Sequence, residues 1–122
     1  MTVPILQRIA AAYSLWHDYM KNLGKTSRYT LGEKIDDFFL EVIELVYIAS
    51  FMPKERKLPY LEKAIVKLDL VKLFLQITWE IKSIDTKKYV TISEKLDEIG
   101  RMLGGWVRQV AVPPGESRVA RK

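Results

Sequence analysis

The chain has 122 residues and no cysteine, which excludes disulfide bonds and thiolate chemistry. Twenty basic side chains stand against fifteen acidic ones, so the formal net charge is +5, which permits binding to a polyanion without requiring it. The length fits one domain with a substantial apolar core, and no apolar run is long enough to span a bilayer. We therefore expect a cytoplasmic protein that makes no membrane contact.

The first predicted helix begins at Pro4, where a proline costs no hydrogen bond because it lies in the first turn. It ends near Asn22, and Gly24 fits the position just after a helix end. Its apolar residues recur at intervals of four and three, the rhythm of helix-bundle packing. The predicted buried residues are Ile5, Ile9, Ala12, Trp16, Tyr19 and Leu23.

The second predicted helix begins at Thr30, which forms a capping-box pattern with Glu33, and ends before Pro53. Its predicted buried residues are Leu31, Ile35, Phe38, Val42, Leu45, Ala49 and Met52, flanked by Phe39 and Val46. Its opposite face carries four carboxylates, Glu33, Asp37, Glu41 and Glu44. Such a face can suggest a metal site, but ferritin-like iron sites need Glu-x-x-His pairs and His17 is the only histidine. We interpret the face as solvated or salt-bridged, and we expect no metal and no cofactor.

The third predicted helix has Pro59 in its first turn, ends near Ser83 and carries two apolar stripes. One stripe contains Leu61, Ile65, Leu68, Val71 and Leu75, and a roughly opposite stripe contains Leu70, Leu73, Phe74, Ile77, Ile81 and Ile84. A helix of a small monomeric bundle needs only one such stripe, and large exposed apolar patches are uncommon on soluble monomers. The second stripe therefore predicts an oligomer interface. The alternative is a central helix that is wrapped by its own chain.

The fourth predicted helix is capped by Asp85 and ends before Pro113. Its predicted buried residues are Tyr89, Ile92, Leu96, Ile99, Leu103, Trp106 and Val110. Gly100, Gly104 and Gly105 interrupt this helix, although an interior glycine costs about 0.5–1 kcal/mol relative to alanine. They predict close packing by another backbone or a bulky side chain such as Trp106. A bent helix end is the alternative.

These elements predict an all-α protein. The short connections make neighbouring helices antiparallel, so we expect an up-down-up-down four-helix bundle over residues 1–112. Residues 113–122 contain almost no apolar side chains, so we expect a disordered basic tail, which contacts nucleic acid or is simply a frayed terminus.

The sequence offers no set of catalytic residues. A nucleophile needs an activating base and an orienting group, but the chain has no cysteine, a single histidine and no Gly-x-Ser-x-Gly elbow. We therefore expect a binding protein and not an enzyme.

Basic side chains off the apolar seams are the candidates for binding nucleic acid, because they can neutralise phosphates and release counterions. The predicted set is Lys63, Lys67, Lys88, Lys95, Arg101 and Arg108 in the helices, with Arg118, Arg121 and Lys122 in the tail. No aromatic residue is clearly interleaved among them, so they predict no strong sequence readout. Solvated helix faces without a binding role are the alternative.

Several stretches resemble Avd, the accessory variability determinant of diversity-generating retroelements. They are Arg28–Ile35, Lys67–Lys72, Trp79–Lys82 and, above all, Tyr89 with Ser93–Trp106, which contains Ile-Gly-Arg-Met-Leu-Gly-Gly-Trp. The resemblance covers about residues 13–110. Small four-helix proteins encoded by intervening sequences of bacterial ribosomal RNA genes form a related, broader group.

The resemblance implies a basic four-helix bundle that assembles as a homopentameric ring. It also implies partnership with a reverse transcriptase, and binding of template RNA or its complementary DNA during mutagenic retrohoming, the process that diversifies a sequence. Two other hypotheses stay open. One is a scaffolding oligomer that docks an acidic protein, and the other is a metal-dependent enzyme that uses the carboxylates of the second helix.

Overall fold

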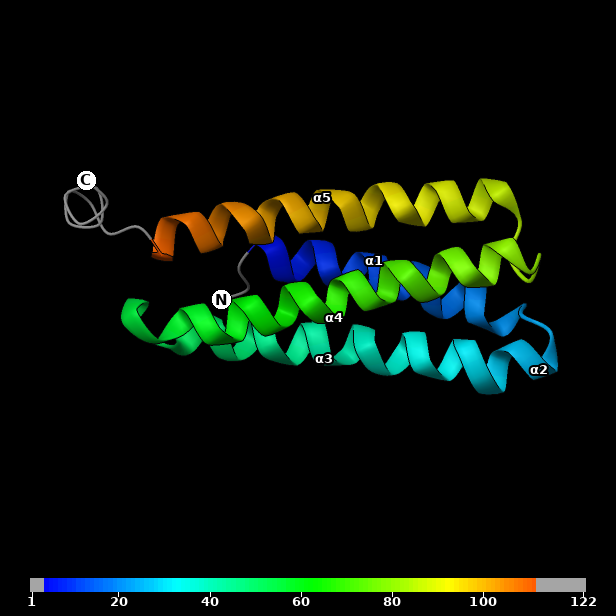
Figure 1. Ribbon diagram of the computed structural model, residues 1–122, viewed down its shortest axis with the longest axis horizontal. Coiled ribbons are helices and arrows are strands. Elements are labelled where there is room, and N and C mark those ends of the chain that lie inside the picture. Colours follow the sequence, from blue (N-terminus) through cyan, green and yellow to red (C-terminus); the bar gives the residue numbers. More distant parts are fainter. Residues whose placement is uncertain (1–3, 112–122) are drawn as a thin grey trace.

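The computed structural model describes residues 4–111, which form four long helices and a short helical corner (Figure 1). The long helices are α1 (Pro4–Lys21), α3 (Glu33–Phe51), α4 (Lys54–Glu80) and α5 (Thr86–Ala111), and the corner consists of α2 (Lys25–Ser27) and the π-helical turn η1 (Arg28–Gly32). The predicted all-α, four-helix fold is confirmed. The predicted tail lies outside the described residues.

Each long helix runs back along the one before it. In Figure 1 the chain follows α1 from left to right, returns along α3, runs out again along α4 and returns along α5. α3 packs on α4, α4 on α5, and α1 on both α5 and α3. The corner and the α4–α5 connection therefore lie at the same end of the bundle. We call this end, residues 18–34 and 79–88, the turn end.

The core is built from one stripe of each long helix. α1 buries Ile5, Ile9, Ala12 and Trp16, followed by Leu23, and α5 buries Ile92, Leu96, Ile99 and Leu103, as predicted. Four further residues predicted to be buried are half-buried at the edge of the core: Tyr19, Tyr89, Trp106 and Val110. Of the first stripe predicted for α4, Leu61, Leu68, Val71 and Leu75 are buried, while Ile65 is half-buried and Ala64 lies in the core. Thr78 is buried with them, and its hydroxyl donates to the carbonyl of Phe74 at 2.6 Å. This hydrogen bond satisfies a polar group in an apolar environment.

The buried side of α3 differs from the prediction by about one residue. Ile35, Val42 and Ala49 are buried as expected, but Phe39 and Val46 take the central positions predicted for Phe38 and Leu45. α3 carries apolar residues on nearly all sides, so its sequence defines the orientation of the helix poorly.

The predicted capping box at Thr30 is wrong. The chain is already helical from Lys25, and the Thr30 hydroxyl donates back to the carbonyl of Thr26 at 2.8 Å. Packing against the end of α1 explains the difference. The Arg28 guanidinium donates to the carbonyls of Lys21 (3.3 Å) and Leu23 (3.2 Å), and a Cβ at Gly32 would lie 3.2 Å from Leu23 Cδ1. Arg28 thus satisfies two carbonyls that the end of α1 leaves free.

α4 begins at Lys54, about one turn earlier than the prediction that Pro59 lies in the first turn of this helix. Pro59 consequently lies inside the helix. The Lys57 ammonium donates to the carbonyl of Ala49 at 2.7 Å, and the amide of Arg56 donates to the carbonyl of Pro53 at 2.8 Å. The Lys57 bond ties the first turn of α4 to the end of α3, and the Arg56 bond joins the N-cap residue Pro53 to the first turn of α4.

The α4–α5 connection is a tight helix stop followed by a helix cap. Lys82 has a left-handed backbone (φ 66°). Its amide donates to the carbonyl of Trp79 at 2.9 Å, and the amide of Ser83 donates to the carbonyl of Thr78 at 2.9 Å, which together form a Schellman motif. Asp85 is the cap that the sequence predicts, because its Oδ1 accepts a hydrogen bond from the Lys88 amide at 2.8 Å.

We predict that Lys82→Gly raises the free energy of unfolding by up to about 1 kcal/mol, because glycine adopts this backbone without steric cost. The control Glu80→Gly, in the last turn of α4, lowers it by about the same amount. Urea denaturation followed by circular dichroism measures both. Equal destabilisation by the two substitutions would contradict the prediction.

The three glycines of α5 differ in how closely other residues pack against them. A Cβ at Gly100 would lie 3.3 Å from Lys72 Nζ and 3.6 Å from Leu68 Cδ2, so α4 packs closely there. At Gly104 and Gly105, a Cβ would meet only the flexible side chain of Arg108, at 3.6 and 3.8 Å. Within the described chain, close helix packing is therefore a reason for Gly100 alone.

Gly104→Ala tests this difference. We expect it to raise the free energy of unfolding by about 0.5–1 kcal/mol, because alanine favours the helix and, within residues 4–111, its methyl group would make only an ordinary contact with the Arg108 side chain. Gly100→Ala is the matched control and gains less, since Lys72 and Leu68 have to shift. Thermal unfolding at low protein concentration compares the two. A loss of stability in Gly104→Ala would reveal a contact that the single chain does not show.

Candidate functional site

Two of the predicted phosphate-binding residues, Lys63 and Lys67, line a groove between α3 and α4. The groove also contains Glu41 and Glu44. The ammonium of Lys67 lies 3.1 Å from a carboxylate oxygen of Glu41 and 5.3 Å from the ring centre of Phe38. The groove is therefore of mixed charge, and the predicted salt-bridged interpretation of the α3 carboxylates is met at Glu41.

Arg101 and Arg108 line a different groove, between α4 and α5. Asp69 and Asp97 line it as well, and Asp97 pairs with Lys72 at 3.2 Å. This groove also combines both signs of charge.

Lys88 and Lys95 belong to neither groove. The Lys88 ammonium lies 5.5 Å from the ring centre of Tyr19 on α1, and Lys95 is exposed. Arg118, Arg121 and Lys122 lie outside the described residues. The structure therefore distributes the predicted basic residues over several surfaces and does not gather them into one.

Basic charge is instead concentrated at the turn end. The turn end holds seven basic and four acidic residues, whereas the rest of the described chain holds ten of each. The basic residues of the turn end are Lys21, Lys25, Arg28, Lys34, Lys82, Lys87 and Lys88, and the acidic ones are Asp18, Glu33, Glu80 and Asp85. All of the net positive charge of residues 4–111 therefore lies at this end.

One contact joins the two halves of the turn end, and two more hold α4 against the start of α5. The hydroxyls of Ser27 and Ser83 are 2.6 Å apart and join the corner to the α4–α5 connection. Trp79 stacks on Tyr89, with ring centres 4.9 Å apart and an interplanar angle of 8°, and its Nε1 donates to the Thr86 hydroxyl at 3.0 Å. Figure 1 shows α2 and the α4–α5 connection at the same end of the bundle. Two of the stretches that resemble Avd, Arg28–Ile35 and Trp79–Lys82, thus meet here.

The sequence contained a signal for this cluster. An up-down-up-down order places the first and third connections at the same end, so Lys25, Lys82 and Lys87 could have been grouped in advance. The basic set predicted from the sequence does not contain this group, because the set was chosen from helix faces and the members of the group belong to different elements.

The second stripe of α4 is only partly exposed. Leu73 (48%) and Ile81 (56%) face solvent, whereas Leu70, Phe74 and Ile77 are half-buried, and Phe74 stacks on Phe38 of α3 at 5.8 Å. Ile84 is only 5% exposed, so it has almost no surface for another copy. The reason is that the α4–α5 connection turns inward after Lys82. Val66, which the prediction omitted, is exposed on α4.

α3 has an exposed apolar row that the sequence prediction missed. Leu40, Tyr47 and Phe51 are exposed and are seven and four residues apart, which places them on one helix face. Tyr47 and Phe51 contact each other edge to face at 4.9 Å. The sequence could have predicted this row, because a second apolar stripe, the feature that predicted an interface on α4, is also present on α3.

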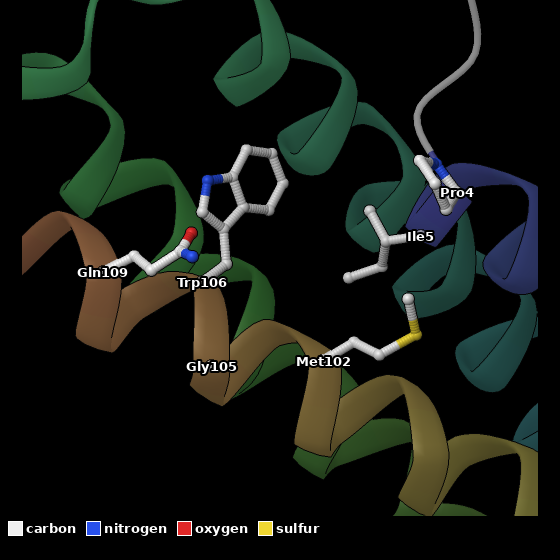
Figure 2. Close-up of a pocket in the computed structure, with 6 residues that line it drawn as sticks. All are labelled: Pro4, Ile5, Met102, Gly105, Trp106 and Gln109. Atoms are coloured by element: carbon white, nitrogen blue, oxygen red, sulfur yellow. The ribbon is translucent and has the colours of Figure 1, made fainter.

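An open apolar pocket of about 480 Å³ lies where the start of α1 meets the end of α5. Figure 2 shows Met102 extending from α5 toward Ile5, with Trp106 one turn further along α5 and Pro4 at the start of α1. Gly105 and Gln109 complete the lining. None of these six residues is titratable, so the pocket offers no side chain for acid–base chemistry.

Two further searches cover the residues that the structure describes. None of the helices within residues 4–111 combines the length and apolar character needed to cross a bilayer. In the same part of the chain, no three histidine, cysteine, aspartate or glutamate side chains are grouped as metal ligands would be.

Comparison with known proteins identifies the family. The model of a family described as bAvd-like matches residues 3–110. A comparison with curated proteins finds no match. The family match includes all four long helices except Ala111 and extends over the range in which the sequence resembles Avd. The chain therefore belongs to the bAvd-like family.

Proposed function

We propose that the protein is a non-catalytic, oligomeric nucleic-acid-binding accessory of a retroelement reverse transcriptase. The observation that carries this proposal is the bAvd-like match over residues 3–110. The resemblance to Avd implies a reverse transcriptase partner, and template RNA or its complementary DNA as the nucleic acid, in mutagenic retrohoming.

The charge distribution supports nucleic-acid binding. A protein that neutralises phosphates with lysine or arginine releases condensed counterions, which drives association without any reading of the bases. The turn end has seven basic and four acidic residues, and this excess of positive charge suits this mode of binding.

The exposed apolar rows support self-association. The α3 row of Leu40, Tyr47 and Phe51 and the exposed stripe of α4, with Val66, Leu73 and Ile81, lie on different helices. A contact between two different surfaces of identical copies is head-to-tail, and such contacts close into rings when the rotation between copies permits. The pentamer implied by the resemblance is one such ring.

The test of nucleic-acid binding is a salt series. The full chain, without reverse transcriptase, is titrated into labelled structured RNA and followed by fluorescence anisotropy. We expect the affinity to fall about 100-fold between about 50 and 200 mM salt if about four phosphates are neutralised. Absence of binding at the lowest salt would contradict the proposal and favour a scaffold that docks an acidic protein. Capture of the reverse transcriptase by the tagged protein tests the partner.

The test of assembly uses one aspartate in each apolar row. We expect the unmodified chain to sediment as a species larger than one chain of 14.2 kDa, and both Phe51→Asp and Leu73→Asp to sediment as single chains. Val90→Asp, at an exposed apolar position of α5, is the matched control and keeps the assembly.

A mixture of the two variants adds a sharper readout. If the interface is head-to-tail, each variant keeps the surface that the other has lost, so the mixture forms pairs of chains but no larger ring. An unmodified protein that sediments as a lone chain at high micromolar concentration would rule out the oligomer.

A further inference from the structure

We propose that the turn end is the surface that holds the nucleic acid, and that the ligand is a single strand whose phosphates lie against Lys25, Lys82 and Lys87. This inference rests on the proposed function and adds to it the location of the site and the form of the nucleic acid. It also replaces the basic set predicted from sequence, which the fold distributes over separate surfaces.

Positive charge is distributed unevenly over the described part of the chain. Outside the turn end, the described residues carry as many acidic as basic side chains, so a polyanion that approaches there meets no net attraction. The turn end contains seven basic and four acidic residues. Long-range attraction between the bundle and a phosphate backbone is therefore directed to this end.

Some basic side chains of the bundle form ion pairs, and others are free to bind a phosphate. Away from the turn end, Lys67 pairs with Glu41 and Lys72 with Asp97, and Arg8 pairs with Glu98. At the turn end, Lys25, Lys82 and Lys87 are exposed and form no ion pair within residues 4–111, and the same is true of Lys63, Lys95 and Arg101 elsewhere, so the two sets differ in their surroundings and not in their availability. A phosphate can bind them without displacing a carboxylate.

Three of the four carboxylates of the turn end, those of Asp85, Glu80 and Asp18, already have local partners. Asp85 Oδ1 accepts from the Lys88 amide at 2.8 Å, where the positive end of the α5 dipole also lies. Glu80 Oε2 accepts from the Gln76 side chain at 3.2 Å, and Asp18 lies 3.7 Å from Lys21. These contacts offset part of the repulsion that the acids would exert on a phosphate.

The turn end is held in a fixed arrangement. The bonds of Arg28 fix the corner to the end of α1, the hydrogen bond between Ser27 and Ser83 joins the corner to the α4–α5 connection, and the Trp79–Tyr89 stack joins α4 to α5. Lys25 and Lys82 are therefore presented by backbone segments that are already ordered. A preordered site binds with a smaller loss of conformational entropy.

An exposed aromatic ring at the same end favours a single strand over a duplex. Tyr29 is 57% exposed and lies in η1, one residue after Arg28 and four after Lys25. Unpaired bases stack on aromatic side chains whatever their sequence, whereas the bases of a duplex already stack on each other. Tyr29 can thus contribute to affinity without giving sequence preference.

The experiment compares two triple variants with the same change in net charge. One removes three lysines of the turn end (Lys25→Gln, Lys82→Gln and Lys87→Gln), and the other removes three exposed charges elsewhere (Lys63→Gln, Lys95→Gln and Arg101→Gln). Both full-length triples are titrated into a labelled single-stranded RNA and into a duplex of the same length, over a salt series. Circular dichroism and sedimentation confirm that each keeps the fold and assembly of the unmodified protein.

We expect the turn-end triple to lose more than about tenfold in affinity for the single strand, with a salt slope lower by about 2, since each lost phosphate contact removes about 0.7. The other triple changes affinity less than about threefold, and Tyr29→Ala weakens single-strand binding about fivefold with an unchanged slope. Equal losses in the two triples would overturn the location, and preference for the duplex would overturn the form of the ligand. If the unmodified protein bound neither RNA, this result would instead contradict the proposed function, on which the inference rests.

Discussion

The burial of one apolar stripe from each of four long helices is the constraint on which the rest of the structure depends. The stripes place α3 and α4, α4 and α5, and α1 and α5 side by side, and short connections require the chain to reverse between them. Connections are mostly polar, because they run over the surface. The corner and the α4–α5 connection therefore bring their lysines to one end of the bundle, and the electrostatic character of the molecule follows from how its core is packed.

Because each helix buries only one stripe in the core, some apolar surface of α3 and α4 stays exposed. α3 and α4 are apolar on more than one side, and a bundle of four helices covers only part of each. Phe38 and Phe74 use some of the remainder by stacking on each other, but Phe51 and Leu73 stay in contact with water. The molecule thus combines a charged end with apolar flanks, a combination that suits an assembly of bundles packed side by side with their ends free to bind a polyanion.

Much of the fold could be predicted from the sequence where a helix has a single apolar stripe. The buried residues of α1 and α5 follow from their heptad spacing, and Asp85 is recognisable as a cap. The orientation of α3 was predictable only to within about one residue, since apolar residues cover most of its sides, and the capping role of Arg28 depends on contacts between α1 and the corner. The candidate site was harder to predict from the sequence than the fold. Whether Lys67 meets Glu41, or Lys72 meets Asp97, depends on how far one helix is shifted along another, which no single sequence specifies. The grouping of lysines at the turn end, by contrast, needed only the order of the helices.

The pocket of Figure 2 shows that Pro4 and the last turns of α5 lie together, at the end opposite the corner. A helix of 26 residues is about 40 Å long, so Ala111 is about that far from the first turn of α5. Because the chain contains no cysteine, Ala111→Cys would provide a unique thiol for a fluorescent dye. Such a dye would lie far enough from Lys87 to leave it undisturbed and close enough for energy transfer to a labelled oligonucleotide held there.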